Sequence, residues 1–246
     1  MRFAISIFLN LLFGILFFDV GKTSNEDQTN VSSHFGAITM VYLSAMFGSA
    51  QPAIFAIPAE RPIFLREYST NHYSAGAYFI SKCFMEAFIT FTQILVTSVI
   101  TFWMIGFQSS FGLFLGIVYA LAMASTAVAV LLGCAVNDSK AAQELLPLVF
   151  VPQFLFAGFF VKIELLPSWL RWVQWLCSLS YGIRLGLLAE FEECADEGET
   201  NCSIILESAN SNADEKWIYW LVLVALFVVF RVWALFVLKQ KANSFY

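Results

Sequence analysis

The chain has 246 residues, a mean hydropathy of +0.74 and only 13% charged side chains. These values lie outside the range of soluble globular proteins and predict an integral membrane protein. The formal net charge of −5 and the lack of a basic patch in the sequence argue against nucleic acid as a partner.

Six apolar runs are long enough to cross a bilayer, which takes roughly 20 residues per helix. The runs do not alternate with polar residues, so helices are favoured over a β-barrel. The first run resembles a signal peptide but lacks a small-x-small cleavage site, so we expect it to be retained. The sequence predicts one all-α domain over residues 1–246, with transmembrane helices at residues 3–18, 35–57, 75–105, 111–136, 145–161 and 217–238.

Charged residues cluster after the second predicted helix, in the stretch AERPIFLREYSTNHY. It contains Glu60, Arg61, Arg66 and Glu67 within eight positions. Two interpretations stay open on the sequence alone: a solvated loop between two membrane helices, or a coupling element that faces a cytoplasmic partner.

Three further charges lie within the predicted helices. Lys82 and Glu86 are four residues apart on the third helix. They are expected either to pair with each other across one turn or to form a polar relay to neighbouring helices. Arg231, in the sixth helix, is expected to extend its side chain to the inner membrane interface.

A long segment separates the fifth and sixth predicted helices. Its part LLPSWLRWVQWLCSLSYGIRLGLLAEF has a helical pattern, but polar residues interrupt it too often for a seventh span. We therefore expect one or two short re-entrant helices in the outer leaflet, packed against protein.

The five cysteines divide into two groups. Cys194 and Cys202 flank an acidic loop, where an oxidising exterior would favour a disulfide; two free or intermolecular thiols are the alternative. Cys83, Cys134 and Cys177 lie in or near apolar segments and are expected to be free thiols.

The orientation follows from three signals. With a cytoplasmic N-terminus, seven Lys and Arg residues lie inside and five outside, which is a weak bias. Two N-glycosylation sequons, at Asn30 and Asn201, would face outward, and six of the seven tryptophans would gather at the outer interface. Both termini are thus expected in the cytoplasm, with the chain in the plasma membrane or another membrane of the secretory route.

Catalytic and metal-binding motifs are missing from the sequence. The two histidines, His34 and His72, fall on opposite sides of the predicted membrane, so no metal site is expected. Gly21-Lys22-Thr23 resembles the end of a P-loop, but Leu16 stands where that motif needs glycine. The chain is expected to hold no cofactor and to have no enzymatic activity by itself.

Two segments carry a family resemblance. ERPIFLREYSTNHYSAGAYFISKCFMEA resembles the region between the second and third helices of G-subfamily ABC transporters, the White and pleiotropic-drug-resistance-like group. AGFFVKIELLPSWLRWVQWLCSLSYGIRLGLLAEF resembles the fifth helix and following outer segment of that family. The resemblance covers nearly the whole chain. It implies an ABC-2 type membrane domain that dimerises, encloses a cavity between its two copies, and is driven by nucleotide-binding domains that bind ATP and Mg²⁺ on the cytoplasmic side.

The resemblance also implies site residues. Glu60, Arg61, Arg66 and Glu67 would contact the nucleotide-binding domain from an amphipathic helix continuous with the third helix. The cavity would be lined by Ser44, Phe47, Val151 and Phe154 below an apolar gate of Phe159 and Phe160. In a chain with 27 phenylalanines, ordinary packing is the simpler explanation for any single one of these aromatic residues.

The function that this resemblance implies is the membrane half of an ATP-driven exporter of lipid-like or amphipathic molecules. The family carries its ATPase ahead of the membrane domain, whereas this sequence starts in the first helix, so a fragment or a permease subunit is expected. Two alternatives remain: a stand-alone permease with a separate ATPase, and a membrane scaffold that does not transport.

Overall fold

The structure is a computed structural model that describes residues 2–23, 28–69, 74–136, 138–155, 171–196 and 200–243. Within these ranges every regular element is a helix, which confirms the all-α prediction. The long elements are α1 (Arg2–Leu16), α3 (Gln28–Ser69), α4 (Ala75–Ile105), α5 (Phe111–Ala135), α6 (Ser139–Leu155), α7 (Ser178–Asp196) and α9 (Lys216–Asn243). The short ones are α2 (Val20–Thr23), α8 (Thr200–Ser208), and the 3₁₀ helices η2 (Arg171–Leu176) and η3 (Ala213–Glu215).

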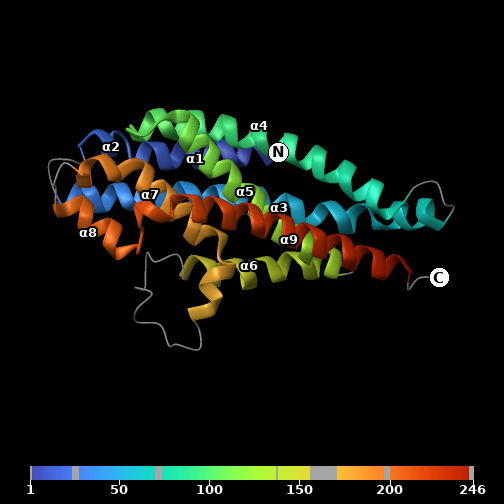
Figure 1. The fold of residues 1–246 in the computed structure, drawn as a ribbon. Coiled ribbons are helices and arrows are strands. Elements are labelled where there is room, and N and C mark those ends of the chain that lie inside the picture. Colours follow the sequence, from blue (N-terminus) through green and yellow to red (C-terminus); the bar gives the residue numbers. More distant parts are fainter. Residues whose placement is uncertain are drawn as a thin grey trace.

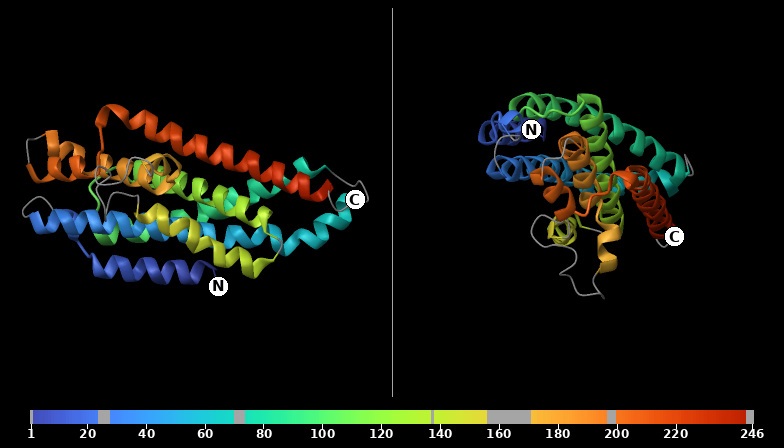
Figure 2. Two further views of the ribbon diagram at one scale, coloured as in Figure 1. Left: turned by 90° about the horizontal axis from the view of Figure 1, so that it is seen from below. Right: turned by 60° about the vertical axis from the view of Figure 1, so that its left-hand side comes forward.

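The long helices run along a common axis (Figure 1). The helices α2, α7 and α8 gather at one end, here named the α8 end, while α3 and α9 finish at the opposite end, here named the C-terminal end. Seen from below, α1 and α9 lie on opposite sides of the bundle, with α3, α5 and α6 between them (Figure 2).

The helix α5 lies at the centre and packs most extensively against α3 and α9. Its sequence AMASTAVAV is rich in small residues, which allow helix backbones to approach closely in a membrane. A Cβ atom placed on Gly133 would lie 2.6 Å from the carbonyl oxygen of Ile54, so a side chain there would separate α5 from α3.

Local capping signals define both ends of α4. The hydroxyl of Ser74 accepts a hydrogen bond from the N–H of Ala77, and Gly106 ends the helix with a φ of 78°. The hydroxyl of Ser110 caps α5 in the same way. Predicted boundaries of 75–105 and 111–136 therefore agree with the structure to within one residue.

The helix α3 is much longer than the prediction of 35–57. It runs unbroken for 42 residues through Pro52, Pro58 and Pro62. Prolines are tolerated in membrane helices because neighbouring groups can satisfy the freed carbonyls. The expected coupling helix is consequently not a separate element continuous with the third helix: residues 60–67 form the last turns of α3.

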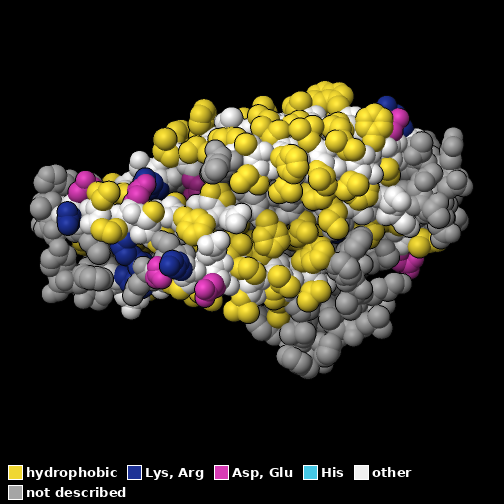
Figure 3. All heavy atoms as spheres, turned by 180° about the vertical axis from the view of Figure 1, so that it is seen from behind, with side chains coloured by type: hydrophobic (Ala, Val, Ile, Leu, Met, Phe, Trp, Pro, Cys, Tyr) yellow, Lys and Arg dark blue, Asp and Glu magenta, His cyan; other side chains and the backbone are white. Residues whose placement is uncertain are grey.

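Four helical segments in the described ranges have the length and composition of membrane spans: Val31–Phe64, Ala75–Ile105, Phe111–Ala135 and Ala213–Lys241. Phe3–Leu16 is apolar but shorter. Seen from behind, hydrophobic side chains cover the middle of the surface and charged side chains gather towards the two ends (Figure 3). This distribution fits an integral membrane protein. Six spans and re-entrant helices remain predictions.

Candidate coupling and substrate sites

At the C-terminal end, Glu60 joins the end of α3 to the start of α4. Its Oε1 lies 2.6 Å from Nζ of Lys82, and the hydroxyl of Tyr78 donates to its Oε2 at 3.0 Å. Both charged side chains are about 40% exposed, which limits such a pair to about 0–1 kcal/mol. This contact is therefore weak and can be exchanged easily.

Arg61, the next residue, binds the end of α5. Its two terminal nitrogens donate to the carbonyl oxygens of Val136 at 2.9 Å and Cys134 at 2.8 Å. Lys241 of α9 donates to the carbonyl of Ala135, between those two, at 2.5 Å. The last carbonyls of a helix lack intrahelical partners and carry partial negative charge, so two cations stabilise this end of α5.

The predicted coupling residues thus fall into two groups. Glu60 and Arg61 bind other helices of the same domain, whereas Arg66 and Glu67 lie further along α3 with exposed side chains. A contact with a nucleotide-binding domain remains a prediction for all four residues.

The charges inside the bundle pair between helices, which excludes the direct pairing of Lys82 with Glu86 and leaves the polar relay as a prediction. Arg231 is 6% exposed and binds groups inside the bundle, so the expected extension of its side chain is wrong. Its Nη1 lies 2.9 Å from Oε2 of Glu86, and its Nη2 donates to the hydroxyl of Thr126 at 3.1 Å. Lys82 and Glu86 therefore bind α3 and α9 respectively, rather than each other.

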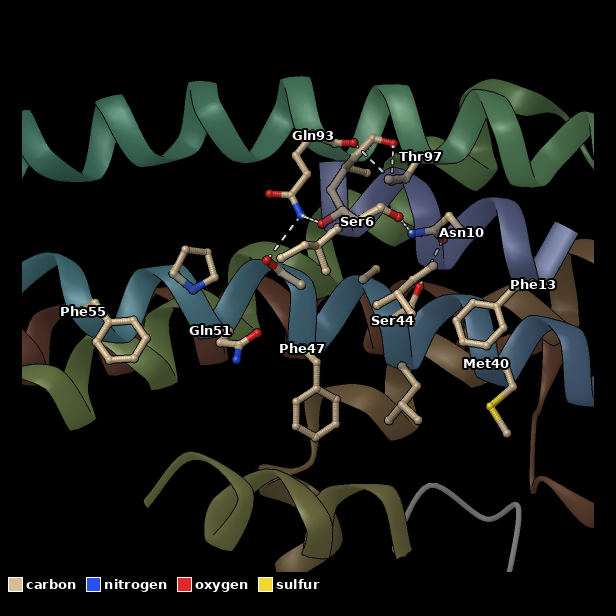
Figure 4. A pocket seen from close by; sticks show the side chains of 17 residues that line it. Ser6, Asn10, Phe13, Met40, Ser44, Phe47, Gln51, Phe55, Gln93 and Thr97 are labelled. Carbon is tan, nitrogen blue, oxygen red and sulfur yellow. Dashed lines mark hydrogen bonds between the residues drawn. The ribbon is translucent and has the colours of Figure 1, made fainter. Parts of the chain in front are cut away.

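A pocket of about 460 Å³ lies between α1, α3 and α4 (Figure 4). No charged residue lines it within the described part of the chain. One wall is polar: the amide of Gln93 donates to the hydroxyl of Ser6 at 3.0 Å, and the hydroxyl of Ser44 donates to Oδ1 of Asn10 at 3.2 Å. The side chain of Gln51 is exposed in the pocket and makes no hydrogen bond to the described residues.

Two of the four predicted cavity residues line this pocket, and the other two lie on α6 outside its lining. Ser44 and Phe47 line it, and the ring of Phe47 lies 5.7 Å from that of Phe150 on α6. Val151 is exposed on α6, and Phe154 is partly buried on the same helix. The proposed gate, Phe159 and Phe160, lies outside the described residues.

At the α8 end, Glu190 of α7 is a buried carboxylate. Its oxygens accept the backbone N–H groups of Gln108 at 2.6 Å and Ser109 at 3.1 Å, in the turn between α4 and α5. Its Oε1 also lies 3.3 Å from Nε2 of His34 on α3. Burial raises the pKa of Glu190, but His34 and the two N–H groups outweigh burial and hold it below its ordinary value.

The disulfide between Cys194 and Cys202 ties α7 to α8, with 6.1 Å between the two Cα atoms. Cys83, Cys134 and Cys177 are free, as expected. Lys216, at the start of α9, forms an ion pair with Glu192. The side chains of the sequon residues Asn30 and Asn201 lie outside the described set, so their glycosylation remains a prediction.

The sequence interpretation missed several polar residues that meet across helices: His34 with Glu190, Asn10 with Ser44, and Gln93 with Ser6. The available signal was a polar side chain within an apolar run, because such residues are costly in a membrane and usually face a partner or a cavity. Their partners are distant in sequence and could not be assigned from it.

Comparison with known proteins places the chain in a family. The family model of the ABC-2 type transporter matches residues 1–191. The chain belongs to the ABC-2 type transporter family. It is 26% identical over 257 residues to ABC transporter G family member 1 of Dictyostelium discoideum, with 97% of this chain aligned, and 29% identical over 247 residues to Protein white of Drosophila melanogaster, with 95% aligned.

Pleiotropic drug resistance protein 1 of Petunia hybrida is a third relative, 26% identical over 206 residues, which span 81% of this chain. The aligned regions make up 32%, 35% and 14% of these three relatives. The chain thus spans about a third or less of their lengths.

Proposed function

We propose that this chain is the membrane half of an ATP-driven exporter of lipid-like or amphipathic molecules. The observation that carries the proposal is the pocket between α1, α3 and α4. Its apolar walls, uncharged polar side and the exposed amide of Gln51 suit a molecule with a hydrocarbon body and a neutral hydrogen-bonding group. A second copy of the domain would complete the cavity against α3 and α6.

The projecting end of α3 supports a nucleotide-binding domain as partner. The whole of α3 has 42 residues, which correspond to about 63 Å of helix, roughly twice the thickness of the hydrocarbon core. One end of α3 must therefore extend beyond the membrane. In this proposal, α1, α3, α4, α5, α6 and α9 cross the membrane within a single domain. The C-terminal end faces the cytoplasm, where Arg66 and Glu67 meet the domain that binds ATP and Mg²⁺.

The α8 end then faces the exterior or the lumen. The disulfide at this end supports that orientation, because disulfides persist in oxidising compartments. Asn30 and Asn201 would carry glycans there.

Charge reversal at the projecting end tests coupling. In the complete transporter, Arg66→Glu with Glu67→Arg should leave surface expression intact, because exposed pairs contribute only about 0–1 kcal/mol to folding. Unmatched charges in the contact with a partner domain would cost about 2–5 kcal/mol and should uncouple export from ATP hydrolysis. The matched control is Lys239→Glu, an exposed residue of α9.

The measurement is export into vesicles alongside ATP hydrolysis. Normal export by the reversed protein would remove the coupling role of α3. No ATP-dependent export of any amphiphile by the unmodified assembly would favour a scaffold.

Substitution in the pocket tests the substrate site separately. Gln51→Leu should raise the KM for export several-fold with basal ATP hydrolysis unchanged, because one hydrogen bond to substrate is lost. Val229→Ala, at an exposed position of α9 away from the pocket and from α6, is the control. An unchanged KM for Gln51→Leu would place the substrate elsewhere.

A further inference from the structure

A small polar pocket lies at the α8 end, apart from the sites described above. Its volume is about 160 Å³, and residues of η2, α7 and the segment leading into α9 line it. They include Trp175, Ser180, Tyr181, Arg184, Asn212 and Glu215. The pocket lies where the candidate span Ala213–Lys241 begins, which is the level of a membrane interface.

The guanidinium group of Arg184 lies against two aromatic rings. Its central carbon lies 5.9 Å from the ring centre of Tyr181 and 5.6 Å from that of Tyr219. Its Nε is buried, and the described residues offer Arg184 no hydrogen bond and no ion pair. A guanidinium fixed in one place normally binds a carboxylate or a phosphate, and this one has donors available for an anion.

An opposite charge lines the same pocket. Glu215 accepts a hydrogen bond from the hydroxyl of Tyr219 at 3.0 Å but forms no ion pair within the described chain. The two charges therefore do not neutralise each other. The indole of Trp175, which is 60% exposed, adds an aromatic face of the kind that binds quaternary ammonium groups.

We propose that this pocket binds the zwitterionic headgroup of a membrane phospholipid. Arg184 binds the phosphate with two N–H donors, while Glu215 and Trp175 hold the ammonium group. The position at the start of α9 favours a lipid over a soluble anion, because the acyl chains would extend beside the exposed apolar residues Trp217 and Leu221. This site is independent of the transport cavity.

Binding of short-chain lipids to the purified full-length protein, followed by native mass spectrometry, tests the proposal. The probes are dihexanoylphosphatidylcholine, dihexanoylphosphatidylglycerol, phosphocholine and inorganic phosphate. The unmodified protein should prefer the phosphatidylcholine probe. Arg184→Gln should weaken that binding about tenfold or more, because charge-assisted hydrogen bonds to the phosphate are lost.

Two variants separate the charges, and a third is the control. Glu215→Gln should reduce the preference for phosphatidylcholine over phosphatidylglycerol, since only the former carries an ammonium group. Arg184→Lys keeps the charge without the bidentate geometry and should bind with intermediate affinity. Lys22→Gln removes an exposed cation of the same end and should change nothing.

Retention of the disulfide between Cys194 and Cys202 checks the fold of each variant. Unchanged phosphatidylcholine binding by folded Arg184→Gln would overturn the site. If phosphocholine or inorganic phosphate bound as tightly as the phosphatidylcholine probe, the assignment of a lipid ligand would be wrong and the pocket would be a site for soluble ligands.

Discussion

The two ends of the bundle are held together by different kinds of contact. At the C-terminal end, Glu60 and Lys82 form a pair that is about 40% exposed, and Arg61 binds backbone carbonyls across helices. At the α8 end, the carboxylate of Glu190 is buried and accepts two backbone N–H groups, and a disulfide ties α7 to α8. The exposed pair of the C-terminal end can exchange its partners at small cost, whereas the buried contacts of the α8 end cannot.

This contrast suits a domain that is moved from one end. Exposed charges are solvated before and after a shift, so breaking their contacts changes the free energy little. Removing the partner of a buried carboxylate leaves polar groups unsatisfied, which is costly. The α8 end should therefore move as a rigid unit while the C-terminal end adjusts.

The pair between Arg231 and Glu86 tests whether burial, rather than position, sets the strength of a contact, because it is buried yet lies in the half nearer the C-terminal end. Arg231→Met should lower the free energy of unfolding by about 3–5 kcal/mol, since it leaves the carboxylate of Glu86 buried without its ion-pair partner. Thermal unfolding in detergent measures this change.

The double variant Arg231→Met with Glu86→Met should recover most of that loss. Arg66→Met, at an exposed position, is the control and should have a small effect. An equally small loss of stability for Arg231→Met and Arg66→Met would contradict the role of burial.

Substitution at Glu190 tests the rigid end directly. Glu190→Gln should lower the free energy of unfolding by about 3 kcal/mol, because the N–H groups of Gln108 and Ser109 and the buried ring of His34 lose a charged partner. The neighbour Glu192→Gln, whose side chain is partly exposed, provides the control. Equal melting temperatures for the two variants would place Glu190 among the weak contacts.

The pH dependence of unfolding gives a second measure of Glu190. Its pKa is lower in the folded protein than in the unfolded chain, so the folded state binds fewer protons. Its stabilisation is complete above the unfolded pKa, about 4.3, and is lost as the pH falls through the folded value. Melting temperatures between pH 7 and pH 3 should show this loss in the unmodified protein but not in Glu190→Gln.

Removal of the disulfide should have a somewhat smaller effect. Cys194→Ser with Cys202→Ser opens a loop with a sequence separation of 8 and should lower stability by about 2–3 kcal/mol on the chain-entropy model. The control is Cys83→Ser, which removes a cysteine that forms no disulfide. Peptide mapping without reductant that found both thiols free would contradict the bond itself.

The smallest effect is expected at the C-terminal end. Lys82→Met should change the free energy of unfolding by about 0–1 kcal/mol, and added salt should reduce the difference further. Urea or thermal unfolding at two ionic strengths provides the measurement. A loss comparable to that of Glu190→Gln would remove the contrast between the two ends.

The sequence by itself determined most of the helices. Ser74 and Gly106 are local signals that fixed both ends of α4, and uninterrupted hydropathy identified α5 and α9. The disulfide could also be predicted from the sequence, because Cys194 and Cys202 are close in sequence and flank one loop. These features depend on neighbours along the chain, so their pattern can be read without knowing how the helices pack.

Only the tertiary structure decided which polar groups meet. His34 and Glu190 come from opposite parts of the chain, and Arg231 pairs with Glu86 because α9 packs beside α4 and α5. The sequence likewise could not predict that α3 continues through Pro58 and Pro62, since proline usually marks the end of a helix or a kink in it. Local propensity specifies where a helix begins and ends, but the partner of a buried charge depends on which helices pack against it.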